Sequence, residues 1–549
     1  MPEFKPNTLY YGDNLLVLRD FPSECVDLIY LDPPFNSNRN YNVLFKESAG
    51  VEAEAQIQAF EDTWHWGIEG TTTWDTYNQI VQKQDEVGRM LQAFVQALGH
   101  NDVTAYLTMM APRLVELRRV LKPTGSIYLH CDPTASHYLK VVMDSVFGAT
   151  NSRTDIVWRR TNAKGLAFKG FPRDHDTLLY YTKEAKFTWN RPFVAYDPAY
   201  VEKFYRFVEE GTGRRYRLSD LTNPNRDRPN LTYEWKGHVR VWRWTKQRME
   251  EAEQHGIIQY SSTGLAAQKR YLDEMQGQPV DSIWDDIEPV QAHSKERLGY
   301  ATQKPEALLE RVISASSNEG DVILDPFCGC GTAVVAAHRL KREWIGIDIT
   351  YLAVDLMQNR LKTTFPGDFK KGVQIDGEPA DEAAALALAE KDKYQFQFWS
   401  VANLGGTSRG GQNKKGADQG VDGVIGFPEV DPEKSGKAAH DFKQVIISVK
   451  GGNTGPSHVR DLIGTVKNES AAIGVLVTIK EPTRGMIDAA ASAGVYQSNF
   501  TKKSYPKIQI ITAGDIVHGK MVEMPPIESL SQYKAAPKAK RGTQSSWDI

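Results

Sequence analysis

Apolar residues gather in short runs that are separated by longer segments with a helical period. The runs at 26–31, 126–132, 320–325 and 343–348 have the length expected of strands that are buried on both faces. Residues 102–121 place apolar side chains three and four positions apart, which predicts a helix that ends at the following Lys-Pro-Thr-Gly sequence. Strands that alternate with helices in this way predict an α/β fold with a largely parallel sheet.

Residues 151–295 have a different character, because arginines, aromatic side chains and polar loops follow one another there without a clear period. The whole chain of 549 residues has a formal net charge of −3, yet residues 151–250 contain 21 Lys and Arg against 12 Asp and Glu. Positive charge concentrated in an acidic chain predicts a surface for a polyanion; the alternative is an ordinary solvated face.

Composition marks the remaining boundaries. Residues 46–100 are acidic and Trp-rich and are interpreted as an insertion, while a block with its own strands follows a charged, Ala-rich stretch. The predicted segments are 1–150 and 296–365 as two halves of one α/β domain, 151–295 as an inserted basic region, 366–392 as a linker that contains a helix, 393–530 as a smaller α/β domain and 531–549 as a disordered tail.

Several classes of protein are disfavoured. No stretch approaches the roughly 20 apolar residues that span a bilayer, and the N-terminus lacks the basic start and apolar core of a secretion signal. The four cysteines are too few and too scattered for a disulfide framework or a zinc site. We therefore expect a cytoplasmic protein with reduced thiols and no membrane partner.

A glycine turn, Asp325–Thr332, connects an apolar strand to an Ala-rich helix. Gly329 and Gly331 allow backbone N–H groups to approach a ligand at the helix N-terminus. The next strand ends at Asp348, whose carboxylate suits ribose hydroxyls. Val334 stands where the dinucleotide pattern has its third glycine, so the turn favours another adenosine-containing ligand. Simple packing of strand against helix is the alternative.

The strand at 26–31 ends in Asp32-Pro33-Pro34-Phe35. Carboxyl ends of parallel strands meet at one edge, so this motif is expected to face the ligand of the glycine turn. The two prolines make the turn rigid and leave its carbonyl groups free to accept hydrogen bonds. Asp32 adds a charged acceptor and Phe35 a flat apolar face, which together suit a planar base with an exocyclic amine, such as adenine or cytosine.

Together, residues 32–35 and 327–332 resemble the catalytic and S-adenosylmethionine motifs of β-class amino-group DNA methyltransferases. The resemblance covers about residues 8–362. It implies a permuted Rossmann-like α/β fold with the target-recognition region between the motifs. It also implies methyl transfer to a base flipped out of double-stranded DNA, in restriction–modification or phage defence. An Asp at the start of the catalytic motif favours adenine N6, and cytosine N4 is the alternative.

The resemblance also assigns roles to single residues and segments. Asp13 would contact the adenine of the cofactor, Asp348 its ribose, and Gln303-Lys304 would line its methionine end. Residues 156–165 and 175–183 would close the target-base pocket. The implied catalytic residues are Asp32, Pro33, Pro34 and Phe35, and the implied cofactor-binding residues are Asp13, Gln303, Lys304, Asp325, Phe327, Gly329, Gly331, Thr332 and Asp348.

The block at 393–530 resembles the PD-(D/E)xK nuclease fold, closest to Mrr-type restriction nucleases. Asp422 and Lys450 match its metal-binding Asp and its Lys, which implies a Mg²⁺ site at Asp422. Ser448 stands where that family has Glu or Gln, and a serine is a poor Mg²⁺ ligand. An active nuclease, an inactive DNA-binding or partner-binding domain and an unrelated small domain remain as alternatives. Candidates for a second acidic ligand are Asp418, Asp461 and Glu469.

A hypothesis from a different class of function also fits the sequence. The chain would then be a DNA-binding subunit of a larger restriction complex, active only with its partners, and a homodimer is a further possibility. No Gly-Lys-Ser/Thr helicase motif is visible, so ATP-driven translocation would need another chain. His130 and His137 are expected to be hydrogen-bonded structural residues rather than metal ligands.

Overall fold

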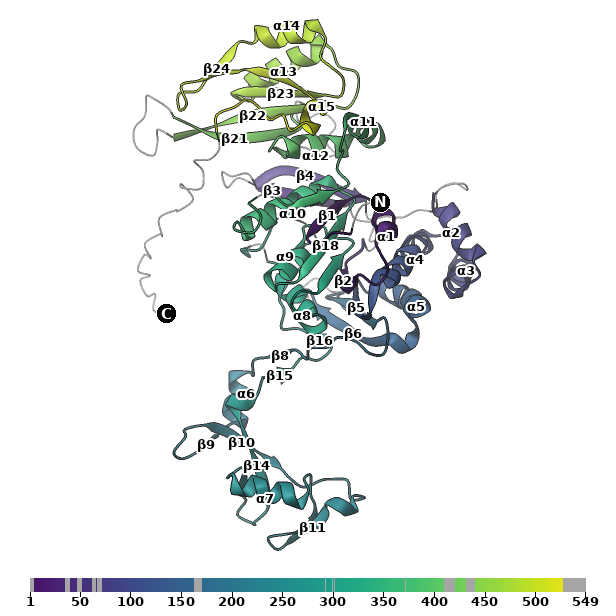
Figure 1. Ribbon diagram of the computed structural model, residues 1–549, viewed down its shortest axis with the longest axis vertical. Coiled ribbons are helices and arrows are strands. Elements are labelled where there is room, and N and C mark those ends of the chain that lie inside the picture. The colour runs from purple at the N-terminus through teal and green to yellow at the C-terminus, as the bar shows by residue number, and fades with distance from the viewer. Residues whose placement is uncertain are drawn as a thin grey trace. The chain divides into compact units, whose positions relative to one another are not determined.

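The computed structural model describes residues 4–34, 40–46, 52–61, 66, 72–161, 170–291, 293–298, 300, 302–370, 372–408, 420–430 and 440–526. The chain splits into two compact units, one made of Met1–Trp189 with Ile283–Ile549 and the other of Asn190–Ser282 (Figure 1). Among the described residues, no helix is long and apolar enough to cross a membrane.

A nine-stranded mixed sheet organises the first unit. Its order is β16-β6-β7-β5-β2-β17-β18-β1-β19, and the six strands from β5 to β19 run parallel. β7 pairs antiparallel with β5 and β6. The strands are β1 (Thr8–Tyr11), β2 (Val26–Leu31), β5 (Leu121–Cys131), β6 (Ser152–Arg159), β7 (His175–Thr182), β16 (Ile283–Trp284), β17 (Val322–Asp325), β18 (Glu343–Asp348) and β19 (Gln374–Asp376).

Helices cover both faces of this sheet. On one side lie α1 (Asn14–Asp20), α4 (Asp102–Val120) and α5 (Ser136–Phe147); on the other lie α8 (Glu306–Ser316), α9 (Thr332–Arg339) and α10 (Tyr351–Thr364) (Figure 1). The helix predicted at 102–121 is α4, which begins with a capping box at Asn101 and buries Leu107 and Leu114 against Ile29 of the sheet. The predicted doubly covered α/β sheet is confirmed.

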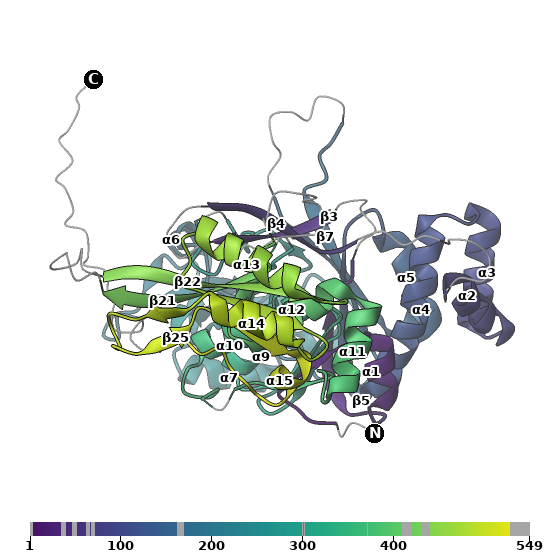
Figure 2. The same ribbon diagram turned by 90° about the horizontal axis from the view of Figure 1, so that it is seen from above.

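The segment expected as an insertion forms helices beside the sheet. Residues 46–100 contain α2 (Thr72–Gln82) and α3 (Glu86–Leu98), which pack against α4 and α5 (Figure 2). Ahead of them, β3 (Asn40–Lys46) and β4 (Glu52–Glu61) pair as an antiparallel hairpin.

The second unit, Asn190–Ser282, has a four-stranded antiparallel sheet and a small core around Trp235, Trp242 and Met249. It is narrower than the predicted region 151–295, because β6, β7 and β16 pair into the large sheet instead. Its elements are β8 (Phe193–Val194), α6 (Pro198–Phe204), β9 (Phe207–Val208), β10 (Arg215–Asp220), β11 (Thr232–Trp235), β12 (His238–Val241), α7 (Lys246–Gln254), β13 (Ile258–Tyr260), β14 (Ala266–Tyr271) and β15 (Gln278–Pro279).

The C-terminal block is a separate five-stranded sheet with the order β20-β21-β22-β23-β26. Helices α13 and α14 lie on one side of it and α12 on the other (Figure 1). Its elements are α12 (Lys393–Asn403), β20 (Thr407–Ser408), β21 (Gly423–Val430), β22 (His440–Lys450), α13 (Pro456–Asn468), β23 (Ile473–Thr478), α14 (Arg484–Ser492), β24 (Val495–Gln497), β25 (Ser504–Pro506), β26 (Ile508–Thr512) and α15 (Ala513–Val517).

The structure differs from the predicted linker at 366–392. Gln374–Asp376 forms β19, which extends the nine-stranded sheet beside β1. Glu382–Lys391 forms α11, whose Ala385 and Ala389 are fully buried in the core of the C-terminal block. The helix expected within this segment is therefore present, but alanines four positions apart share one of its faces and pack it into a core, so the segment is not a free linker.

Candidate active site

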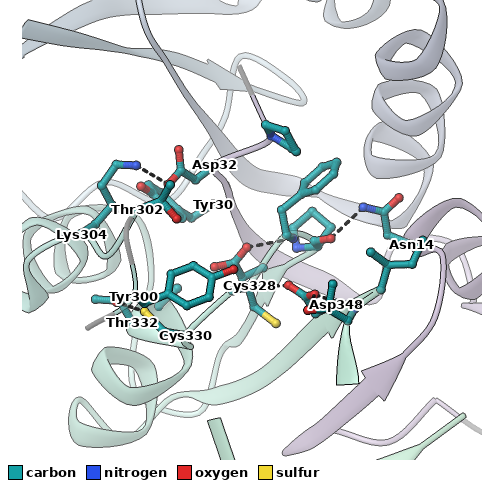
Figure 3. A pocket seen from close by; sticks show the side chains of 18 of the residues that line it. Asn14, Tyr30, Asp32, Tyr300, Thr302, Lys304, Cys328, Cys330, Thr332 and Asp348 are labelled. Carbon is teal, nitrogen blue, oxygen red and sulfur yellow. Dashed lines mark hydrogen bonds and ion pairs between the residues drawn. The ribbon is translucent and has the colours of Figure 1, made fainter. Parts of the chain in front are cut away.

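The acids predicted at two strand ends lie at one edge of the sheet. β2 and β17 are parallel neighbours in which Ile29 pairs with Leu324, so Asp32 and Asp325 follow strands that end side by side. A cavity with an empty volume of about 1070 Å³ opens at this edge (Figure 3). Of the predicted site residues, the cavity is lined by Asp13, Asp32, Pro34, Gln303, Lys304, Asp325, Phe327, Gly329, Thr332 and Asp348.

Two predicted residues do not line the cavity, and a third is not described by the structure. Pro33 is buried behind Asp32 and is not part of the cavity lining, and Gly331 is also absent from it. Gly331 has φ +74°, and a Cβ atom there would lie 2.5 Å from Cγ of Met357, so only glycine lets the turn approach α10 this closely. Phe35 lies outside the described residues.

One carboxylate oxygen of Asp32 accepts a hydrogen bond and the other does not. Lys304 donates to its Oδ2 and forms an ion pair with it (Figure 3). Its Oδ1 is buried and has no hydrogen-bond partner within the described part of the chain. Lys304, predicted to line the methionine end of a cofactor, therefore also contacts Asp32 directly. A buried acceptor without a partner is costly unless a ligand satisfies it.

Asp348 is held by the glycine turn. Its Oδ2 accepts from the backbone N–H of Gly329 at 2.9 Å, and its Oδ1 accepts from the N–H and the hydroxyl of Thr350 at 2.9 and 2.8 Å. Burial raises the pKa of Asp348, although these hydrogen bonds favour the charged form. The carboxylate is thus fixed in position at the end of β18.

Asp325 is more deeply enclosed. Its Oδ1 accepts from the backbone N–H of Phe327 at 3.1 Å, and burial raises the pKa of the Asp325 carboxyl well above its usual range. Asp13, Asp32 and Asp348 also line the cavity, which therefore has four carboxyl groups among the described residues. Such a lining favours a ligand that carries positive charge, as the sulfonium and ammonium groups of S-adenosylmethionine do.

Asp13 and Gln303 position backbone around the cavity. Asp13 caps α1 by accepting from Leu15 N at 2.8 Å and forms an ion pair with Arg113 at 2.9 Å. Gln303 accepts from Leu298 N at 2.8 Å and donates to Glu296 O at 2.6 Å, which orders the loop before α8.

Sequence reasoning missed Asn14 and Tyr300. Asn14 donates to the carbonyl of Pro326 at 2.7 Å and so joins the first half of the domain to the glycine turn 312 residues later. Tyr300 packs within 3.2 Å of the position that a Cβ of Gly329 would occupy. The only signal for Asn14 in the sequence was that a polar residue directly follows Asp13.

The described residues of the nuclease-like block do not assemble a magnesium site. Asp422 Oδ2 accepts from Val449 N at 2.6 Å and lies 4.0 Å from Lys450 Nζ, while Ser448 is a buried neutral side chain. Within the described ranges, no group of three or more His, Cys, Asp or Glu side chains is arranged to hold a metal ion. Asp418 lies outside those ranges. The donor set therefore does not fit Mg²⁺, which prefers several oxygen ligands.

Comparison with known proteins assigns a family to each of the two parts of the chain. Residues 26–359 match the N6/N4 family described as DNA methylase, and the chain belongs to that family. Residues 396–518 match the family described as NACHT-associated inactive Restriction Endonuclease 1. The predicted combination of a DNA methyltransferase with a restriction-endonuclease-like domain is confirmed.

Sequence identity to individual relatives is low. The chain is 30% identical over 361 residues to the type II methyltransferase M.EcaI of Enterobacter cloacae, which covers 65% of this chain and 69% of the relative. It is 25% identical to the StyLTI Mod subunit of a type III restriction-modification enzyme from Salmonella typhimurium, over 61% of this chain and 50% of the subunit. A crystal structure of a DNA modification methylase from Thermus thermophilus, complexed with S-adenosyl-L-methionine, is 16% identical with a TM-score of 0.33, and the match covers 67% and 98% of the two chains.

The buried carboxyl of Asp325 predicts a pH-dependent stability. The unfolded chain ionises Asp325 near pH 4, whereas the native protein keeps it neutral to higher pH, so its contribution to stability falls as pH rises between the two values. In cofactor-free protein, the unfolding free energy of Asp325→Asn should therefore rise relative to that of wild type as the pH increases above about 4, by at most about 1.4 kcal/mol per pH unit, until the native carboxyl ionises. Melting temperatures from pH 5 to 8 measure this, with exposed Asp20→Asn as control; parallel curves for Asp325→Asn and wild type would contradict it.

Proposed function

We propose that this protein is a site-specific methyltransferase that acts on adenine N6 in double-stranded DNA, within restriction–modification or phage defence. The observation that supports this best is the buried Oδ1 of Asp32, which precedes the Pro-Pro turn beside the cavity and has no hydrogen-bond partner among the residues that the structure describes. An exocyclic amine placed there supplies the missing donor.

The residues of the cavity fit S-adenosylmethionine as the cofactor. When bound, the cofactor supplies an electrophilic methyl group. Asp348, held at the end of β18, would accept from its ribose hydroxyls. Gln303 and Asn14 keep the walls of the cavity in place through their backbone contacts.

Asp32 then orients the target base. Its Oδ1 accepts a hydrogen bond from the amine. This hydrogen bond draws the nitrogen lone pair out of conjugation with the ring and directs it toward the methyl group. Lys304 holds the other oxygen and so fixes the carboxylate. Phe35 is proposed as the stacking face for the flipped base, which offsets part of an unstacking cost of a few kcal/mol.

Cytosine N4 is the second candidate target, because the family covers both bases. The Asp at the start of the catalytic motif favours adenine. A partner-dependent role in a larger restriction complex is a third candidate, in line with the similarity to a type III Mod subunit.

Nucleoside mass spectrometry tests the target base. DNA incubated with the protein and S-adenosylmethionine should contain N6-methyladenine. Asp32→Ala should lower the transfer rate about 10²–10³-fold, as for other lost hydrogen-bonding groups that act in the transition state, while cofactor affinity stays unchanged. Glu24→Gln, an exposed carboxylate, is the control. N4-methylcytosine would exclude adenine, and full activity of Asp32→Ala would exclude the role of Asp32.

The unit Asn190–Ser282 is proposed as the DNA-binding, target-recognition surface. Arg226, Arg228 and Arg240 are exposed on and beside the β11–β12 hairpin. Arg214, by contrast, already pairs with Asp273 and Glu274, so it adds little free charge. Exposed guanidinium groups of this kind suit phosphate contacts.

Replacing Arg226, Arg228 and Arg240, on and beside the hairpin, with Gln should weaken DNA binding. The slope of log affinity against log salt should become shallower by about 0.9 for each phosphate that the variant no longer neutralises. Fluorescence anisotropy between about 50 and 200 mM salt measures the slope, with Arg118→Gln on α4 as a control outside this unit. An unchanged slope would exclude this surface.

The C-terminal domain is proposed to bind DNA or a restriction-complex partner without cutting. Its single proposed metal ligand, Asp422, already accepts from the backbone, and Ser448 replaces the second acid. We expect no Mg²⁺-dependent cleavage of plasmid DNA by the intact protein. If cleavage is seen and Lys450→Ala removes it, the domain is an active nuclease and this proposal is wrong.

A further inference from the structure

A chain of buried polar side chains runs beneath the cavity. Tyr30 Oη lies 2.9 Å from His130 Nδ1, and His130 Nε2 lies 3.1 Å from Asp176 Oδ2. The three residues come from β2, β5 and β7, and each is at most 2% exposed. The chain confirms that His130 is hydrogen-bonded, as predicted. Buried polar chains cost free energy that apolar side chains of similar shape would avoid, so this one calls for an explanation.

Tyr30 brings this chain to the reaction site. It stands two residues before Asp32, so its side chain leaves the sheet on the same side, and it lines the cavity with Asp32 and Lys304 (Figure 3). Burial raises the pKa of Tyr30 well above its usual value, and the nearby charge of Asp32 adds to this. Tyr30 is therefore a neutral hydroxyl beside the carboxylate that is proposed to hold the amine.

The direction of the hydrogen bonds follows from Asp176. Burial works against its ionisation, but the hydrogen bond from His130 and the charges of Lys304 and Arg160 leave the pKa of Asp176 lowered. An ionised Asp176 accepts the proton of His130 Nε2, which leaves Nδ1 free to accept from the Tyr30 hydroxyl. Arg160 Nε lies 3.3 Å from Asp176 Oδ1 and forms an ion pair with it, and 39% of the Arg160 side chain is exposed to solvent.

We propose that Tyr30, His130 and Asp176 form the path by which the target amine loses its proton, an inference that rests on the proposed methyl transfer. As the amine lone pair forms the N–C bond, the C–S bond breaks and its electron pair stays on sulfur. The nitrogen then carries one proton too many. Tyr30 Oη takes this proton while its own passes to His130 Nδ1, giving an imidazolium that is paired with Asp176 and later releases the proton to solvent. Asp32, with one oxygen bound to Lys304, keeps the amine in place.

The test compares two buried hydroxyls. Tyr30→Phe removes the hydroxyl of the relay; Tyr128→Phe removes one on β5 that bonds Ser316 at 2.7 Å, outside the relay. In single-turnover methylation, Tyr30→Phe should be slowed about 10²-fold and lose the rise of rate with pH near neutrality, with unchanged affinity for cofactor and DNA. Tyr128→Phe should keep the wild-type rate and pH profile.

A second readout needs no activity. In ¹⁵N-histidine NMR of the cofactor-free protein, His130 should show the tautomer with its proton on Nε2, with its signal assigned from His130→Gln. Protonation at Nδ1 would overturn the relay. Equal rates and pH profiles for the Tyr30 and Tyr128 variants would also overturn the relay. If the wild-type protein methylates DNA in the same assay, that result leaves the proposed function intact. A wild type that methylates no DNA would instead contradict the proposed function.

Discussion

The site depends on the parallel pairing of β2 with β17. Leu28 lies opposite Ile323, a residue from the far half of the chain. Because both strands point the same way, their carboxyl ends open at one edge of the sheet. This pairing places Asp32 beside Asp325, and the third parallel strand, β18, adds Asp348. Every proposed chemical role in the cavity follows from it.

Several carboxyl groups in one cavity raise the electrostatic free energy of the folded protein, and the surrounding residues offset this in two ways. Asp13 and Asp32 are paired with the cations Arg113 and Lys304. Asp348, at the end of β18, is instead satisfied by backbone N–H groups of tight turns. The cations come from segments that follow other strands, so the sheet and its helices must be complete before the site is electrostatically balanced.

The C-terminal domain touches the same region. Gln395 of α12 accepts from the backbone N–H of Tyr351, the residue that follows Thr350 at the start of α10. Asn403 donates to the hydroxyl of Tyr351 at 3.0 Å. The restriction-endonuclease-like domain is therefore packed against the turn that carries Asp348, rather than joined to the methyltransferase by a free linker.

The sequence by itself determined the α/β class, the two strand-end motifs and their order, because apolar runs, glycines and prolines act through local geometry. It also located Asp32 and the glycine turn. It did not show the pairing of Lys304 with Asp32, the capping role of Asp13, the chain from Tyr30 to Asp176 or the packing of α11. These depend on which strands become neighbours and which helix faces meet, and contacts between residues far apart in the chain leave no local pattern in a single sequence.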